Sequence, residues 1–145
     1  MAAGSRRLAR EQALQMLYQA ELAGVSAEET IRVHYEREPE PEPAIRAFSE
    51  RLVRWTLTHL EEVDELISEL CHNWSLDRLA AIDRNLLRLG IAELRSEPDT
   101  PGAVVIDEAV ELAREFADSE SGSFVNGILE AARKRIRPKA EDDAR

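Results

Sequence analysis

Three arginines near the start of the chain are the residues whose type and spacing most directly suggest a chemical role. Arg6, Arg7 and Arg10 occur within a run of five residues that contains no acid. A planar guanidinium donates paired hydrogen bonds to phosphate oxygens, so such a cluster suits a nucleic-acid backbone. Tyr18 follows on the same expected helix, where its ring can stack on an unpaired base. The structural alternative is that Tyr18 packs in the core and the arginines only decorate a helix start.

Enzyme-like chemistry has little support in the sequence. The chain contains no Gly-x-Ser-x-Gly elbow, phosphate-binding loop or dinucleotide fingerprint. His59, Cys71 and His72 are the soft metal ligands nearest to one another, but their spacing matches no zinc pattern. Neighbouring residues on a helix also point in different directions. We therefore expect no catalytic residue, no metal site and no cofactor.

The charge of the chain is unevenly distributed. The 145 residues carry 19 Lys+Arg and 29 Asp+Glu, a net charge of −10, which by itself argues against nucleic acid. Residues 11–69 hold 14 acids and five arginines, whereas residues 1–10 and 133–139 are basic. Because salt screens charges beyond about 8–10 Å, a local basic patch can still bind phosphate on an acidic protein. The alternative is that both basic clusters are solvated helix ends.

Apolar residues recur at steps of three and four along most of the chain, which predicts an all-α fold. The first helix is expected to end at Gly24, and the alternating prolines of residues 36–43 predict an extended acidic linker. One long amphipathic pattern follows over residues 48–70. Ser75 is the expected N-cap of a helix that continues to about Arg95, and two further helices cover residues 105–116 and 124–132. Gly127, inside the last of these, indicates either close packing or access for a ligand.

Three features of the sequence bear on the cellular compartment, namely membrane spans, a signal peptide and the use of cysteine. No run of about 18 apolar residues is present, so no membrane span is expected. The segment after Arg6 and Arg7 lacks the pattern of a signal peptide. A single cysteine, Cys71, cannot form an internal disulfide and fits a reducing cytoplasm.

Three sequence blocks in order resemble the NusB family of bacterial transcription antitermination factors. They are residues 5–18 (SRRLAREQALQMLY), 82–94 (IDRNLLRLGIAEL), and 105–113 (VIDEAVELA) followed by 123–129 (SFVNGIL). The resemblance implies two packed helical subdomains of about three helices each. It predicts one RNA-binding domain over 1–145, with lobes at about 5–72 and 75–136 and a frayed tail at 139–145.

The resemblance also implies a non-enzymatic function. NusB-like proteins bind the boxA element of ribosomal RNA leaders as single-stranded RNA. They do so with NusE, a small-subunit ribosomal protein, in an antitermination complex with RNA polymerase. Carried over by position, the expected RNA-binding residues are Arg6, Arg7, Arg10, Tyr18, Ser123 and Phe124, and the expected partner-binding residues are Asp83 and Glu120. Some family members form homodimers that cover the RNA-binding face, which makes a homodimer an expected alternative state.

Two departures from the family pattern and two rival functions remain. Leu8 and Ser123 stand where family members commonly have basic residues, which predicts weaker RNA binding without NusE.

The net charge of −9 over residues 11–69 favours a second hypothesis, a helical module that docks a basic ribosomal protein without touching RNA. A third, an RNA-modifying enzyme, lacks a Gly-rich cofactor loop or catalytic cysteine motif in this sequence.

Overall fold

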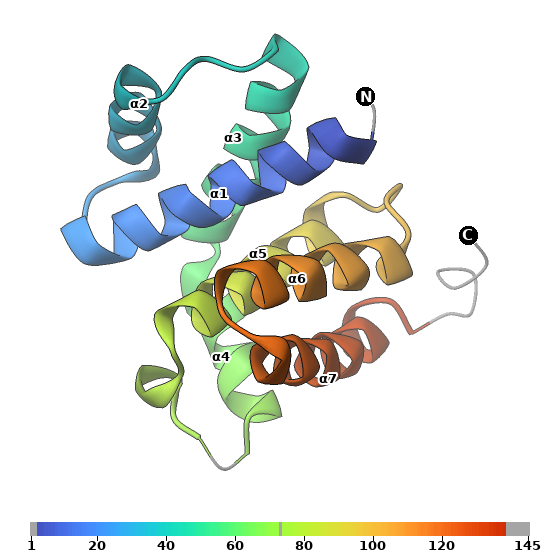
Figure 1. Cartoon of the computed structure of the whole chain (residues 1–145). Helices are drawn as coiled ribbons and strands as arrows, with labels where there is room; N and C mark the ends of the chain where they lie inside the picture. The colour runs from blue at the N-terminus through green and yellow to red at the C-terminus, as the bar shows by residue number, and fades with distance from the viewer. Residues whose placement is uncertain (1–2, 73, 139–145) are drawn as a thin grey trace. The chain divides into compact units, whose positions relative to one another are not determined.

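The structure, a computed structural model, describes residues 3–72 and 74–138, and every regular element in these ranges is helical (Figure 1). Backbone contacts divide the chain into two compact units, which we call unit 1 (up to His59) and unit 2 (from Leu60). The all-α prediction is confirmed. Unit 1 contains α1 (Ala3–Ala23), α2 (Ala27–Arg37) and α3 (Pro43–Thr58). Unit 2 contains α4 (Leu60–Leu70), the 3₁₀ helix η1 (Leu76–Arg78), α5 (Ala81–Ser96), α6 (Gly102–Phe116) and α7 (Ser119–Ile136).

Local sequence sets the helix ends of unit 1. Gly24 has a φ of +66°, the left-handed conformation that ends α1. The Ser26 hydroxyl caps α2 by accepting a hydrogen bond from the Glu29 backbone N–H at 3.2 Å. Residues 38–42 lie outside any helix and form the connection to α3 in Figure 1. Pro43 then begins α3 at a position where a missing backbone N–H loses no helical hydrogen bond.

The three helices of unit 1 pack around one apolar core. Tyr35 of α2 links the other two helices. Its hydroxyl donates to Oε1 of Gln12 on α1 at 2.9 Å, and the guanidinium carbon of Arg46 on α3 lies 4.3 Å from the centre of its ring. The buried apolar side chains of unit 1 are Ala9, Ala13, Leu14, Met16, Leu17, Ala20, Ile31, Ile45, Phe48, Leu52 and Val53.

A buried histidine interrupts this apolar packing. His34 of α2 is buried, and neither of its ring nitrogens has a hydrogen-bond partner among the described residues. Burial lowers the pKa of His34 below its ordinary value of 6.5, and the carboxylate of Glu38 at the end of the helix partly opposes this shift. The neighbouring Tyr35 ring, which meets the imidazole edge-on at 4.7 Å, supplies no charge. Burial therefore favours the neutral form of His34 in the native state.

We expect the free energy of unfolding to decrease as the pH falls below about 6.5. In that range the unfolded chain binds a proton that native His34 excludes, and the loss is complete only below the lowered native-state pKa. Urea titrations across this pH range should be compared with those of His34→Phe, which keeps a buried ring but cannot titrate. Identical pH dependence in the two proteins would contradict the assignment.

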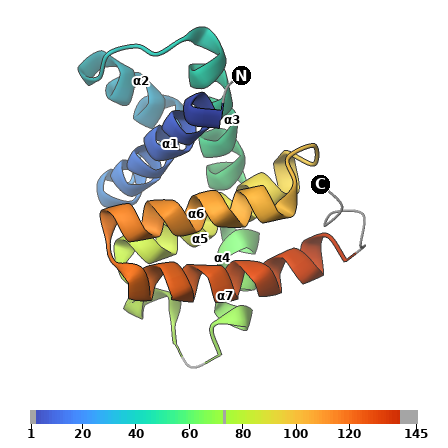
Figure 2. The same cartoon turned by 45° about the vertical axis from the view of Figure 1, so that its right-hand side comes forward.

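Unit 2 is built around α5, most of whose residues are buried. In both views α6 and α7 run side by side (Figures 1 and 2). Gly90 lets α5 and α7 approach closely, because a Cβ atom there would lie 2.7 Å from Cδ1 of Leu129. The buried apolar side chains of the helices are Val63, Ile67, Leu86, Leu87, Leu89, Ile91, Ala92, Leu94, Val105, Ile106, Ala109, Val110, Leu112, Ala113, Val125, Leu129 and Ala132.

A buried ion pair joins α4 to α5. Nε and Nη2 of Arg88 donate to the two carboxylate oxygens of Asp64 at 2.8 and 2.9 Å. Nη1 of Arg88 also donates to Oδ1 of Asn85 at 3.1 Å. Arg88 is buried, whereas Asp64 is partly exposed. This paired contact fixes both the distance and the rotation of α4 against α5.

Several boundaries differ from those expected. The pattern over 48–70 is two helices, because α3 ends at Thr58 and α4 begins at Leu60. The structure accordingly divides the chain there rather than near residues 72–75, and α4 packs with α5 and α7 in unit 2. Ser75 precedes the short η1 turn rather than a long helix, and α5 begins at Ala81. The tail predicted to fray, residues 139–145, lies outside the described residues.

The structure also bears on three expectations from the sequence, which concern the single cysteine, metal binding and membrane spans. Cys71, at the end of α4, is buried, and burial raises the pKa of its thiol. Among residues 3–72 and 74–138, no group of three or more His, Cys, Asp or Glu side chains is placed to hold a metal ion. No helix in these ranges combines the length and hydropathy needed to cross a bilayer.

Candidate functional site

The arginine cluster predicted to bind RNA lies on the first turns of α1 in unit 1. Its members differ in accessibility. Arg10 is only 3% exposed, and its guanidinium carbon lies 5.6 Å from the centre of the buried Phe48 ring on α3. Arg6 lies over the same ring at 4.8 Å, but both it and Arg7 retain partial exposure. Arg6 and Arg7 can therefore offer more surface to a phosphate than Arg10 can.

Farther along α1, Tyr18 is 41% exposed. It is not a core residue, so the structural alternative considered for it is wrong. Leu8 and Leu22 are also exposed. Helix α1 thus presents arginine and aromatic side chains that can contact a backbone and a base.

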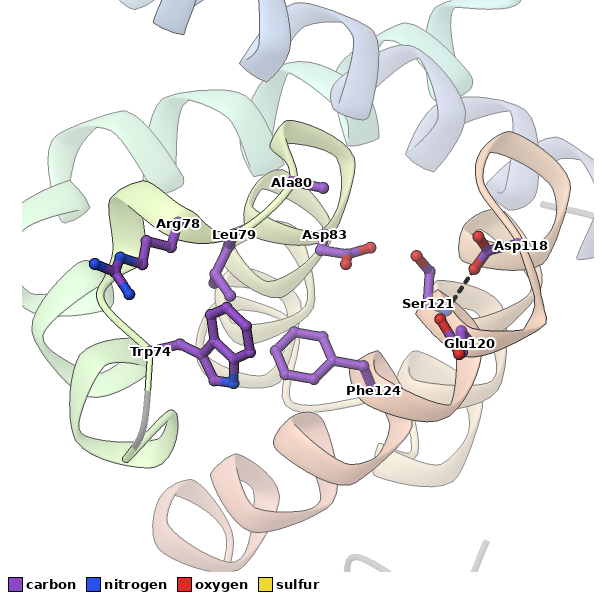
Figure 3. Close-up of a pocket in the computed structure, with 9 residues that line it drawn as sticks. All are labelled: Trp74, Arg78, Leu79, Ala80, Asp83, Asp118, Glu120, Ser121 and Phe124. Carbon is purple, nitrogen blue, oxygen red and sulfur yellow. Dashed lines mark hydrogen bonds between the residues drawn. The ribbon is translucent and has the colours of Figure 1, made fainter.

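The second group of predicted residues gathers around a pocket in unit 2, drawn in Figure 3. The pocket has a volume of about 390 Å³ and lies between the η1–α5 segment and the first turns of α7. Asp83, Glu120 and Phe124 all line it. Trp74, which the sequence interpretation did not include, lines it as well and places its ring near that of Phe124. A tryptophan outside the apolar periodicity, just before Ser75, was the signal that could have revealed it.

The charges and the hydrogen-bond acceptors in this pocket favour an occupant that is a cation or a hydrogen-bond donor. Three carboxylates and one guanidinium line it, those of Asp83, Asp118, Glu120 and Arg78. Asp118 is already used, because its side chain caps α7 by accepting from the Ser121 backbone N–H at 2.8 Å. In contrast, Oδ1 of Asp83 is buried without a hydrogen-bond partner among the described residues. Aromatic faces beside carboxylates attract a guanidinium or ammonium group rather than a phosphate.

Ser123 and Phe124 do not share a surface, although they are neighbours in sequence. Phe124 faces the pocket just described, whereas Ser123 lines a separate groove between α6 and α7, with Asn126 and Arg114. The structure therefore brings Phe124 together with Asp83 and Glu120 but places Ser123 apart from them. Adjacent positions on a helix differ by about 100°, which accounts for the separation.

Gly127 lies on an open part of α7. A Cβ atom added there would meet nothing within 4 Å, so close helix packing does not explain this glycine. The other explanation that the sequence suggested, access for a ligand, stays a prediction.

The basic segment near the C-terminus is engaged within unit 2. Arg133 pairs with Glu130 of the same helix at 2.9 Å, and Arg135 pairs with Glu69 of α4 at 2.6 Å. The guanidinium of Arg137 donates to three backbone carbonyls, those of Leu94 at 3.0 Å, Thr100 at 2.7 Å and Glu97 at 3.1 Å. Much of this cluster thus stabilises the fold. Lys139 lies outside the described residues.

Comparisons with known proteins agree with the sequence blocks. The model of the NusB family matches residues 7–134. The transcription antitermination protein NusB of Myxococcus xanthus is 45% identical over 130 residues, covering 88% of this chain and 93% of that protein. Its counterpart from Desulfitobacterium hafniense is 45% identical over 139 residues, covering 94% and 93%.

Solved structures show the same relationship. A structure of T. maritima NusB superimposes with a TM-score of 0.84 at 34% identity, covering 95% of this chain and 96% of that one. A crystal structure of the antitermination factors NusB and NusE in complex with dsRNA also gives 0.84, at 32% identity, covering 92% and 99%.

Proposed function

The chain belongs to the NusB family, and we propose from this that it is a transcription antitermination factor that binds boxA-type RNA together with NusE. It acts in the cytoplasm, on RNA emerging from RNA polymerase, and has no catalytic step of its own. The observation that carries the proposal is the surface of α1, where Arg6 and Arg7 retain exposure and Tyr18 is exposed on the same helix.

The two candidate surfaces suggest a division of labour between RNA and protein. Arginine and tyrosine side chains on α1 suit a phosphate backbone and an unpaired base. The acidic aromatic pocket of unit 2 suits a basic side chain of NusE, with Asp83 and Glu120 as acceptors. The structure of a related NusB with NusE and dsRNA supports both classes of partner. Arg10, Ser123 and Phe124 remain predicted RNA contacts. Leu8 supplies none, so RNA affinity should depend strongly on NusE.

Fluorescence anisotropy with labelled boxA RNA, in the presence and absence of NusE, tests the proposal. The double variant Arg6→Ala/Arg7→Ala should weaken RNA binding by tenfold or more, because a hydrogen bond to a charged group contributes about 1.5–3 kcal/mol and each 1.4 kcal/mol is a factor of ten in affinity. Arg10 is left intact because its replacement would disturb the packing over Phe48. The matched control is Arg32→Ala, which removes an exposed arginine that pairs with glutamates on α2.

Two results would contradict the proposal. One is unchanged RNA affinity of the double variant in both conditions. The other is tight NusE binding with no gain of RNA affinity in the ternary mixture, which would instead support the module that docks a basic protein without touching RNA. Light scattering on the same samples distinguishes a monomer from a homodimer.

A further inference from the structure

We propose that Trp74 is a specificity-determining residue of the acidic aromatic pocket of unit 2, and that it selects an arginine side chain of the protein partner over a lysine. This inference rests on the proposed function, in which NusE supplies the basic side chain that enters the pocket. It adds the identity of that side chain. It also adds Trp74, which lies outside every sequence block resembling the family.

One carboxylate oxygen of the pocket lacks the donor that its burial calls for. Oδ1 of Asp83 is buried with no hydrogen-bond partner among the described residues. A buried acceptor without a donor destabilises the free protein, so a ligand that donates to it recovers this loss on binding. Glu120 of α7 supplies a second carboxylate to the same pocket, opposite in sequence and helix to Asp83 of α5. An occupant with several donors therefore fits the pocket.

The aromatic rings distinguish a planar cation from a compact one. Trp74 and Phe124 both line the pocket, and their rings lie near each other in Figure 3. A guanidinium can stack on an aromatic face while it donates hydrogen bonds in its own plane, whereas an ammonium is compact and strongly hydrated. Tryptophan also attracts a cation more strongly than phenylalanine does. Trp74 therefore favours arginine.

Trp74 is accessible, and the segment that carries it is anchored at both ends. The residue is 55% exposed. The Trp74 backbone N–H donates to the carbonyl of Cys71 at 2.9 Å. Nη1 of Arg84 donates to the carbonyl of Leu79 at 2.7 Å, and Leu79 is itself buried. A pocket wall that is ordered before binding lowers the entropic cost of association.

An unpaired RNA base is the competing occupant, because bases also stack on aromatic rings. The charges of the pocket favour the cation instead. Three carboxylates line it against the single guanidinium of Arg78, and in Figure 3 the Arg78 side chain extends away from Asp83 and Glu120. A nucleotide would bring its negative phosphate to this acidic surface, and an arginine incurs no such repulsion.

The first test titrates N-acetylated arginine amide and lysine amide, which differ only in their side chains, into the full chain. The indole N–H signals are followed by NMR. The chain has two tryptophans, so Trp55→Phe identifies the signal of Trp74. We expect the arginine compound to shift that signal at concentrations several-fold lower than the lysine compound. Equal affinities would overturn the inference, as would a signal that moves with boxA RNA alone but with neither amide.

The second test measures NusE affinity by calorimetry. Trp74→Ala should weaken NusE binding by about five- to thirtyfold, the range expected for a cation–π contact that loses water on binding. Trp74→Phe should recover part of the loss. Asp83→Asn should also weaken binding, and its effect combined with Trp74→Ala should be less than additive because both groups contact one side chain. The control is Val104→Ala, which shortens an exposed apolar residue of α6 outside the pocket and should keep the wild-type affinity.

The outcomes separate this inference from the function on which it rests. Wild-type NusE affinity in Trp74→Ala overturns the role of Trp74 and leaves the proposed function standing. Absence of NusE binding by the wild type overturns the proposed partnership and this inference together. Thermal unfolding of each variant checks that unit 2 keeps its stability, and the amide titrations need no substitution at Trp74.

Discussion

Replacing Asp64 by alanine is expected to lower the free energy of unfolding by about 3 kcal/mol, the largest effect of any single change considered. The reason is that the change leaves the positive charge of Arg88 buried without the carboxylate of Asp64. Arg88 is buried, and both of its paired hydrogen bonds to Asp64 would be lost. Removing one partner of a buried ion pair costs about 3–5 kcal/mol in general. The partial exposure of Asp64 places the expected value at the lower end.

Chemical denaturation of the purified protein measures this effect. Glu65→Ala is the matched control, because Glu65 is the next residue of α4 and is exposed, so its change should stay within about 0.5 kcal/mol. The double variant Asp64→Leu/Arg88→Met removes both charges and should recover much of the lost stability. A loss in Asp64→Ala no larger than that of the control would show that the pair does not hold α4 on α5.

The second large effect is expected at Arg137, just beyond α7. We expect Arg137→Ala to lower the free energy of unfolding by about 2–3 kcal/mol. Its guanidinium donates to the carbonyls of Leu94, Glu97 and Thr100, near the end of α5 and in the turn that follows. The last carbonyls of a helix have no partner within the helix and carry partial negative charge, so a cation with several donors stabilises them. Arg137 thereby ties the end of α5 and the turn after it to the segment that follows α7.

Lys134→Ala is the control for this prediction, since Lys134 is an exposed cation on α7. It should change stability by less than about 0.5 kcal/mol. Arg137→Lys should give an intermediate loss, because a lysine keeps the charge but cannot reach three diverging carbonyls with a planar fork. If Arg137→Ala reduced RNA affinity while leaving stability unchanged, the structural assignment would fail.

The helical fold was largely predictable because its signals are local. Apolar spacing identified most of the helices, and Gly24 and Pro43 mark boundaries through backbone preferences that a sequence displays directly. Helix α2 was not predicted, because its short polar sequence shows only a narrow buried stripe, Thr30, Ile31 and His34. The break at His59 was also missed, since the apolar pattern continues through it.

The candidate site was predictable in its residue types but not in its grouping. Arg10 is buried against Phe48 of α3, and neither this burial nor the exposure of Tyr18 can be read from the pattern within α1. The separation of Ser123 from Phe124 depends on the rotation of α7. Trp74 joins its site through contacts between segments distant in sequence, and periodicity carries no information about such contacts.

The burial of Cys71 gives the molecule a built-in reporter. It is the chain's single cysteine, and it lies at the end of the helix that the Asp64–Arg88 pair holds in place. A thiol reagent reaches such a group only during transient opening, so the modification rate measures how often that region opens. The opening free energy of α4 can therefore be followed without introducing a label. The modification rate of Cys71 can be compared with and without NusE or RNA. A partner that slows the modification is one whose binding is coupled to the closed state of unit 2.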